Sequence, residues 1–178
     1  MKRFGNLFEE VCAVDNIAFA HKNASKGKQH YKEVKMVNSN PEKYFDKISQ
    51  LLLTKSYKNS PYEIMTVKTD GGKVRDIYKL PYYPDRIIHH AIMQIIEPIW
   101  FKSLIRDTYS SIKGRGIHDG VRRLKKALRD EKGTKYCLKL DIKKYYQSIP
   151  NEQLKNVVAK KIKDDKFLNL VNEIIDST

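Results

Sequence analysis

The sequence predicts an α+β fold, with helices on both sides of a β-hairpin and one further strand near the C-terminal end. Three observations predict this class. Apolar residues recur at helical spacing in six segments, a β-rich segment surrounds a turn signal, and a short apolar run ends in a carboxylate. The expected order is helix, helix, hairpin, helix, helix, strand, helix, helix. With 178 residues, 40% of them hydrophobic, the chain has ample material for a core.

Two helices are expected before the hairpin, over residues 6–20 and 41–54. Asn40 is placed to cap the second helix, with Pro41 in its first turn. Residues 22–35 between them are basic and predict a loop or a helix end. The apolar positions of the two helices are Leu7, Val11, Val14, Ala18, Tyr44, Ile48, Leu51 and Leu52.

The hairpin is expected over residues 62–80, because TDGG at 69–72 supplies residues that tolerate positive φ at a turn. After Pro81 and Pro84, residues 85–99 carry isoleucines on one wide stripe, which predicts a well-buried helix.

Further along, residues 116–130 predict a helix, residues 136–141 a short strand, and two more helices follow. Asp164 and Asp165, the only Asp pair, are expected to cap the last helix rather than bind metal. The apolar stripes of these three helices are Ile117, Val121, Leu124, Leu128; Leu154, Val157, Val158, Ile162; and Phe167, Leu168, Val171, Ile174, Ile175.

Charge is the strongest compositional feature: 35 Lys and Arg against 21 Asp and Glu give a formal net charge of +14. Residues 102–144 hold 14 of the basic and 5 of the acidic residues, so this segment supplies +9. Such a concentration favours a phosphate backbone as partner, although a solvated helix face is an equally good explanation for the helix alone. The helix residues concerned include Arg122, Arg123 and Lys126.

Several classes of protein are excluded by composition. No stretch reaches the length of about 18 apolar residues that a membrane span needs, so no membrane partner is expected. The N-terminal residues lack an apolar signal core, and Cys12 and Cys137 are isolated, which argues against a disulfide framework or a cysteine zinc site. We therefore expect a soluble, cytoplasmic protein.

Asp141 closes the strand expected over residues 136–141. On a strand, Tyr136, Leu138 and Leu140 would face one way, and Cys137, Lys139 and Asp141 the other. A carboxylate at a buried strand end needs a partner, which can be a bound metal, a lysine or a helix N-terminus. By itself the position favours the last two.

The segment YCLKLDIKKYYQSI at 136–149 resembles the first catalytic motif of reverse transcriptases, in particular the bacterial group that includes group II intron, diversity-generating retroelement and retron-like enzymes. Residues 73–81 with 85–91 are similar to the family's fingers hairpin and the helix after it. Residues 109–116 and 6–28 resemble the next family segment and the N-terminal extension. The resemblance implies a helical extension at 1–60, fingers at 61–133 and the start of a palm at 134–178.

The resemblance also implies roles for single residues. Asp141 and the Ile142 carbonyl would bind catalytic Mg²⁺ in a two-metal site, since such sites use oxygen ligands. The remaining implied contacts to a deoxynucleoside triphosphate are the backbone N–H groups of Lys144 and Tyr145, the bulk of Tyr146 as a gate against a 2′-hydroxyl, and the side chains of Arg75 and Lys68.

RNA template and DNA primer are the implied macromolecular partners. Lys113 and Arg115 would approach their backbones, beside Arg122, Arg123 and Lys126. Without the resemblance, Arg75 is an exposed strand residue paired across the sheet. Arg86 either contacts the template or primer backbone as well, or is a structural anchor between its helix and the preceding loop.

The sequence contains no aromatic-x-Asp-Asp motif, the second catalytic element of this family. We therefore expect a truncated polymerase that is inactive alone and active as the full-length enzyme. The alternative is a non-catalytic, basic RNA-binding module that shares the fold. Residues 97–101 and 110–116 favour the retroelement and retron-like branches over intron maturases.

Overall fold

The chain folds as two units, distinguished by which residues contact one another. A computed structural model describes residues 3–69, 71–72 and 74–177. The first unit comprises Met1–Glu97 and Ile149–Thr178, and the second comprises Pro98–Ser148. The family resemblance predicts a different division, at residues 60 and 133. That division separates the subdomains of a polymerase and not groups of residues in contact, and it stays a prediction. In the described residues, no helix is long and apolar enough to cross a membrane.

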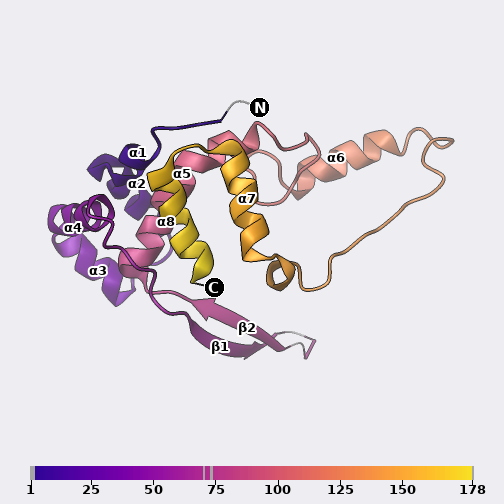
Figure 1. Cartoon of the computed structure of the whole chain (residues 1–178). Coiled ribbons are helices and arrows are strands. Elements are labelled where there is room, and N and C mark those ends of the chain that lie inside the picture. Colours follow the sequence, from indigo (N-terminus) through magenta and orange to yellow (C-terminus); the bar gives the residue numbers. More distant parts are fainter. Residues whose placement is uncertain (1–2, 70, 73, 178) are drawn as a thin grey trace. The chain divides into compact units, whose positions relative to one another are not determined.

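The first unit begins with the helices α1 (Phe8–Cys12), α2 (Val14–Ala24), α3 (Lys32–Ser39) and α4 (Pro41–Leu53) (Figure 1). The helix expected over residues 6–20 is broken, because Ala13 has an extended backbone (φ −61°, ψ 132°). α3 was not expected, since its buried Val34 and Val37 mark only two turns. The predicted cap of α4 is confirmed: the Asn40 side-chain oxygen accepts the Lys43 N–H at 3.4 Å.

The core of this unit lies between α1, α2 and α4, with Val11, Ile17 and Ile48 fully buried. Ser49 of α4 donates its hydroxyl hydrogen to the Cys12 carbonyl at 2.7 Å, which satisfies a carbonyl at the end of α1. Burial raises the pKa of the Cys12 thiol to about 12, so this cysteine is an uncharged core residue.

The last two helices, α7 (Asn151–Lys161) and α8 (Asp165–Asp176), lie side by side and confirm the two helices expected there (Figure 1). The N-terminal segment joins them. Phe4 donates its N–H to the Lys161 carbonyl at 2.8 Å and accepts the Lys163 N–H at 2.7 Å. Phe4 is therefore hydrogen-bonded, through its backbone, to the segment that connects α7 to α8, about 160 positions further along the chain.

Asp164 strengthens this junction by capping two helices. Its Oδ1 accepts the Phe167 N–H at 3.1 Å, which confirms its predicted place as N-cap of α8. Its Oδ2 accepts the N–H groups of Leu7 at 2.7 Å and Phe8 at 2.9 Å, at the start of α1. Burial raises the pKa of Asp164, but hydrogen bonds from Phe8, Phe167 and Leu7 outweigh burial, and the net pKa is lowered.

The hairpin consists of β1 (Glu63–Lys68) and β2 (Val74–Lys79), paired antiparallel as expected. A kinked segment, η1 (Tyr82–Arg86), in which Tyr83 has an extended backbone (φ −112°, ψ 130°), leads into α5 (Ile87–Phe101). The helix was predicted to be well buried along its length, and this holds for its start, where Ile87, Ile88 and Ala91 have no exposed surface. Further along, Ile95 and Ile96 are only half-buried.

The anchor at the start of α5 is Asp85, not Arg86. Asp85 is fully buried, and its Oδ1 accepts the Tyr57 hydroxyl at 2.8 Å and the Ser60 N–H at 3.1 Å. Arg86 is exposed. The bridge from this helix to the preceding loop is therefore made by the carboxylate, because a buried carboxylate needs donors while an exposed guanidinium is satisfied by water.

The second unit contains α6 (Ile117–Ala127), which confirms the basic helix, and a single tight turn, η2 (Tyr145–Ser148). The strand expected over residues 136–141 is wrong: these residues have no regular structure and are exposed. A strand needs a neighbour for its N–H and C=O groups, and the only sheet in the described residues is the hairpin β1–β2. Helices with a two-stranded sheet are compatible with the expected α+β class.

We expect Asp164→Ala to lower the free energy of unfolding by about 3 kcal/mol, since three N–H groups lose a charged acceptor. Asp165→Ala is the matched control: it removes the same charge one residue later, at an exposed position, and should cost about 0.5 kcal/mol. Urea unfolding followed by circular dichroism measures both. Equal losses in the two variants would contradict the double cap.

The lowered pKa of Asp164 also predicts a pH dependence. Its stabilising contribution is complete above the ordinary pKa of 3.8 and is lost as the pH falls through the lower pKa of the folded state. The difference in unfolding free energy between wild type and Asp164→Ala should therefore shrink on acidification below about pH 4. A constant difference across this range would show that the carboxylate charge is not what stabilises the junction.

Candidate nucleic-acid interface

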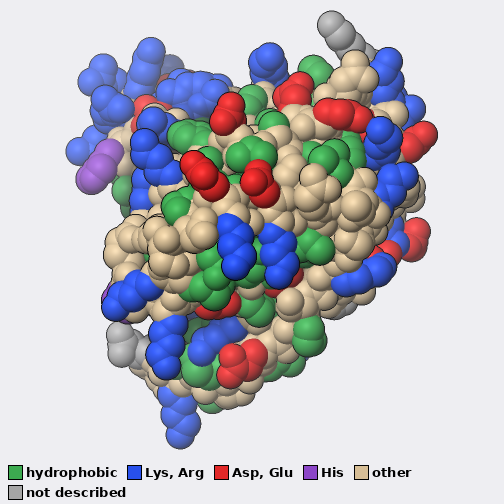
Figure 2. Space-filling view, turned by 90° about the vertical axis from the view of Figure 1, so that its left-hand side faces the viewer, with side chains coloured by type: hydrophobic (Ala, Val, Ile, Leu, Met, Phe, Trp, Pro, Cys, Tyr) green, Lys and Arg blue, Asp and Glu red, His purple; other side chains and the backbone are tan. Residues whose placement is uncertain are grey.

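Positive charge is concentrated in the second unit. Its residues hold 14 Lys and Arg against 5 Asp and Glu, whereas the first unit holds the other 21 Lys and Arg against 16 Asp and Glu. On the face of the first unit that carries α1 to α4, blue and red side chains are interspersed (Figure 2). Most of the excess of basic over acidic residues thus lies in the second unit, which is the part of the chain best suited to bind a polyanion.

α6 is amphipathic, but its apolar side is not covered. Ile117, Val121, Leu124 and Leu128 are between 43% and 74% exposed. Ile99 is the only buried residue among those described in the second unit, so this unit has almost no core of its own. Its arrangement depends instead on polar contacts between α6 and the loop before it.

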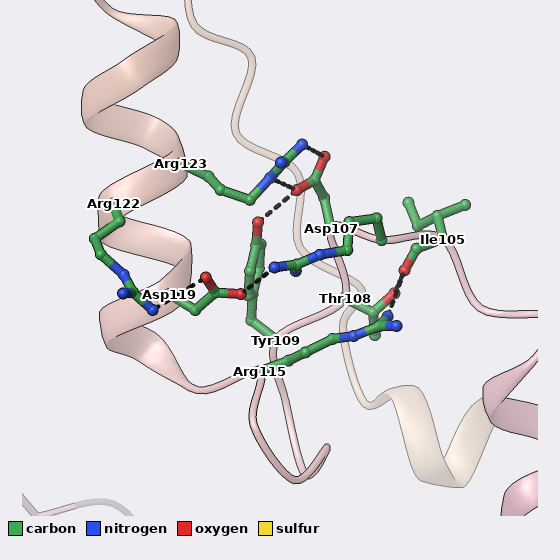
Figure 3. Close-up of polar contacts among 9 residues, drawn as sticks. Ile105, Asp107, Thr108, Tyr109, Arg115, Asp119, Arg122 and Arg123 are labelled. Atoms are coloured by element: carbon green, nitrogen blue, oxygen red, sulfur yellow. Dashed lines mark hydrogen bonds and ion pairs between the residues drawn. The ribbon is translucent and has the colours of Figure 1, made fainter.

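Asp119, in the first turn of α6, binds two arginines (Figure 3). Its Oδ2 lies 2.8 Å from Arg106 Nη2 and its Oδ1 lies 3.3 Å from Arg122 Nη2. The hydrogen bond from Arg106 is the main cause of the lowered pKa of this carboxyl. Arg106 thereby ties the loop to the start of the helix.

Asp107 makes the second tie, to the middle of α6 (Figure 3). Its carboxylate accepts hydrogen bonds from Nε and Nη2 of Arg123, the latter at 3.0 Å, and from the Tyr109 hydroxyl. Arg123, followed by Tyr109, lowers the pKa of Asp107. The Tyr109 ring lies against Gly120, where an added Cβ would come within 3.3 Å of it. A glycine at this position therefore allows the ring to approach the helix closely.

These contacts divide the basic residues expected to bind nucleic acid. Arg122 and Arg123 pair with carboxylates, and Arg115 donates Nη1 to the Ile105 carbonyl at 3.3 Å. Lys113 and Lys126 are exposed and make no ion pair with any described residue. The lysines are thus the freer phosphate ligands. Asp107 and Asp119 were not identified from the sequence: their pairing with Arg123 and Arg106 across the loop leaves no local pattern, and the i,i+3 pairing of Asp119 with Arg122 within α6 was not considered.

The predicted metal ligand Asp141 is exposed and has no ion pair or hydrogen bond among the described residues. The argument from a buried strand end therefore does not apply to it. No group of three or more His, Cys, Asp or Glu side chains in the described residues could hold a metal ion. A single carboxylate does not fit a complete two-metal site, which needs several oxygen ligands.

The residues after Asp141 form the tight turn η2. Lys144 has a positive φ of 52°, and its carbonyl accepts the Ser148 N–H at 3.0 Å. The Tyr145 and Tyr146 rings lie edge to face with centroids 5.3 Å apart, and Tyr146 is 88% exposed. Ile142 is also exposed. The turn presents these side chains to solvent, and their implied nucleotide contacts stay predictions.

Arg75 and Lys68 lie on opposite faces of the hairpin, in the first unit. Arg75 pairs with Val67, and Lys68 pairs with Val74. Directly paired residues share a face and neighbours along a strand alternate, so the two basic side chains point apart. The expectation that Lys68 assists Arg75 on one phosphate group is not supported by this register. Both side chains are exposed.

No protein-family model matches the chain. Protein YkfC of Escherichia coli is 26% identical over 122 residues, which are 67% of this chain and 32% of the relative. The uncharacterized 91 kDa protein in the cob intron of Schizosaccharomyces pombe is 26% identical over 133 residues, 74% of this chain and 16% of the relative. The putative COX1/OXI3 intron 2 protein of Saccharomyces cerevisiae is 23% identical over 135 residues, 74% and 15% respectively.

The chain is similar to intron-encoded proteins. It spans about a third of the length of the bacterial relative and about a sixth of the two intron proteins. The expectation from residues 97–101 and 110–116, which favours the retroelement and retron-like branches, stays a prediction.

We expect Lys126→Gln to weaken nucleic-acid binding a few-fold and to reduce the slope of log K against log salt concentration by about one, because one phosphate contact is lost. Fluorescence anisotropy with a labelled RNA duplex over a salt series measures both. Lys47→Gln, at an exposed position of α4, removes an equal charge from the first unit and should leave the slope unchanged. Identical slopes in the two variants would exclude α6 as the interface.

Proposed function

We propose that this chain is the N-terminal part of an RNA-directed DNA polymerase related to intron-encoded proteins, and that it binds template, primer and nucleoside triphosphate. One observation carries the proposal: Asp141 and Lys144 to Tyr146, which resemble a polymerase motif, lie in the same unit that holds the concentrated positive charge. Similarity to two intron proteins supports it independently.

In this proposal the second unit supplies electrostatic attraction and one carboxylate. Lys113 and Lys126 bind backbone phosphates, and Asp141 contributes one ligand to Mg²⁺, which would activate the primer hydroxyl once other ligands complete its site. Tyr146 limits the space beneath the sugar. Arg75 binds triphosphate oxygens from the hairpin, for which its planar guanidinium is suited.

A non-catalytic RNA-binding module is the second candidate. The exposed, unpaired Asp141 and the absence of a cluster of metal-binding side chains among the described residues favour it for the chain taken alone. Both candidates use the same basic surface, so only a measurement of polymerisation separates them.

In the full-length gene product, we expect Asp141→Asn to reduce primer extension by at least about a thousandfold, because it removes a charged ligand from the catalytic metal. Affinity for a template–primer duplex should stay within about twofold, since the substitution removes a negative charge from an already positive unit. Extension assays with radiolabelled primer and anisotropy on the same duplex measure the two quantities.

Asp130→Asn is the matched control, because Asp130 is another exposed carboxylate of the second unit and should leave extension unchanged. Wild-type extension by Asp141→Asn would refute the role of this residue. A full-length product that binds duplex but never extends a primer would favour the binding module.

A further inference from the structure

A pocket of about 370 Å³ lies in the first unit, between the base of the hairpin and α5. The hairpin side is formed by Tyr62, Tyr78 and Leu80, and the helix side by Arg86, His89, His90 and Met93. None of the residues expected to contact a triphosphate lines it. Its volume falls within the range of pockets that hold small ligands, about 300–1,000 Å³.

The hairpin contributes aromatic surface to this pocket. Tyr62 and Tyr78 lie edge to face with ring centroids 6.1 Å apart, and Tyr78 is 55% exposed. The pairing of Ile64 with Tyr78 places the even-numbered residues of both strands on one face. That face carries Tyr78 at the pocket, then Asp76, which accepts the Thr66 hydroxyl at 2.7 Å, and Lys68 at the far end.

The helix contributes positive charge. Arg86 is exposed and makes no ion pair with any described residue, and the pocket lining contains no carboxylate. Burial lowers the pKa of both His89 and His90, so both are uncharged near neutral pH and Arg86 is the cation of the pocket. An aromatic wall beside a free guanidinium suits a planar, negatively charged ligand.

The wall behind the pocket is held by hydrogen bonds. The Asn59 amide donates to the Ser60 carbonyl at 3.0 Å, so its Oδ1 is the acceptor for His89 Nε2 at 2.9 Å. Tyr57, which donates to the buried Asp85, also lies 3.0 Å from the same oxygen. This network fixes the His89 ring before any ligand arrives, which reduces the entropic cost of binding.

We propose that this pocket binds one nucleotide of a single-stranded nucleic acid, with the base against Tyr62 and Tyr78 and the phosphate at Arg86. Stacking on tyrosine combined with a cation at the phosphate is how proteins bind single strands without reading their sequence. The choice of ligand rests on the proposed function, but the site is separate from Asp141 and from the basic helix α6. The pocket binds single-stranded nucleic acid, whereas α6 binds the phosphate backbone of single-stranded and double-stranded nucleic acid alike.

The test is anisotropy on the whole chain with a short labelled single-stranded RNA and, separately, a blunt RNA duplex. Arg86→Gln should weaken single-strand binding about tenfold, through loss of a charged hydrogen bond. Tyr78→Ala should weaken it at least about fivefold and Tyr78→Phe should not, because stacking needs the ring and not the hydroxyl. Duplex binding should be unchanged in all three. Both positions are exposed, so the variants should fold, as circular dichroism checks.

Lys79→Gln is the matched control: like Arg86→Gln it removes one positive charge, but from β2, on the face of the hairpin that points away from the pocket. Equal losses in Arg86→Gln and Lys79→Gln would overturn the proposal. Adenosine monophosphate as competitor distinguishes recognition of a free nucleotide, which displaces the RNA, from recognition that needs a strand. If the wild-type chain binds duplex RNA and the pocket variants bind single-stranded RNA as tightly as wild type, only the pocket proposal is refuted. If the wild-type chain binds neither RNA, the proposed function is refuted as well.

Discussion

The first unit depends on a carboxylate, that of Asp164, which accepts three backbone N–H groups from opposite ends of the chain. Each bond satisfies a donor that the first turn of a helix leaves open, so one side chain sets the starts of both α1 and α8. With the bonds between Phe4 and the α7–α8 connection, it brings the terminal segments into one structure. Residues 98–148 are consequently an insertion into a unit that is completed by what precedes and follows them.

The inserted second unit is built on a different principle. It buries almost nothing, and its loop is tied to α6 by Asp107 and Asp119. Exposed ion pairs contribute little free energy each and are screened by salt, so this unit is held more weakly than the first. The same carboxylates occupy two arginines of α6. Some of the positive charge counted in this unit is therefore neutralised by carboxylates of the same unit. The lysines, which have no such partner among the described residues, contribute more of the attraction to nucleic acid.

Much of the fold was predictable because apolar spacing is a local signal. The hairpin, the buried start of α5, the caps at Asn40 and Asp164 and the last two helices were all predicted from residues within a few positions of one another. α3 was missed because two apolar turns are too short to stand out. The strand at residues 136–141 was wrong because an alternating pattern shows which side chains could share a face, but not whether a neighbouring strand is present to accept its hydrogen bonds.

Residue type and local order were enough to predict most of the helical segments, the hairpin, the uneven charge and the resemblance around Asp141. Only the three-dimensional structure showed that Asp85 anchors α5, that Asp107 and Asp119 bind Arg123 and Arg106 between the loop and α6, and that Lys68 and Arg75 face apart. It also brought Tyr62, Tyr78 and Arg86 around one pocket. These outcomes depend on strand register and on which distant groups meet, and neither is encoded in the spacing of residues along the chain.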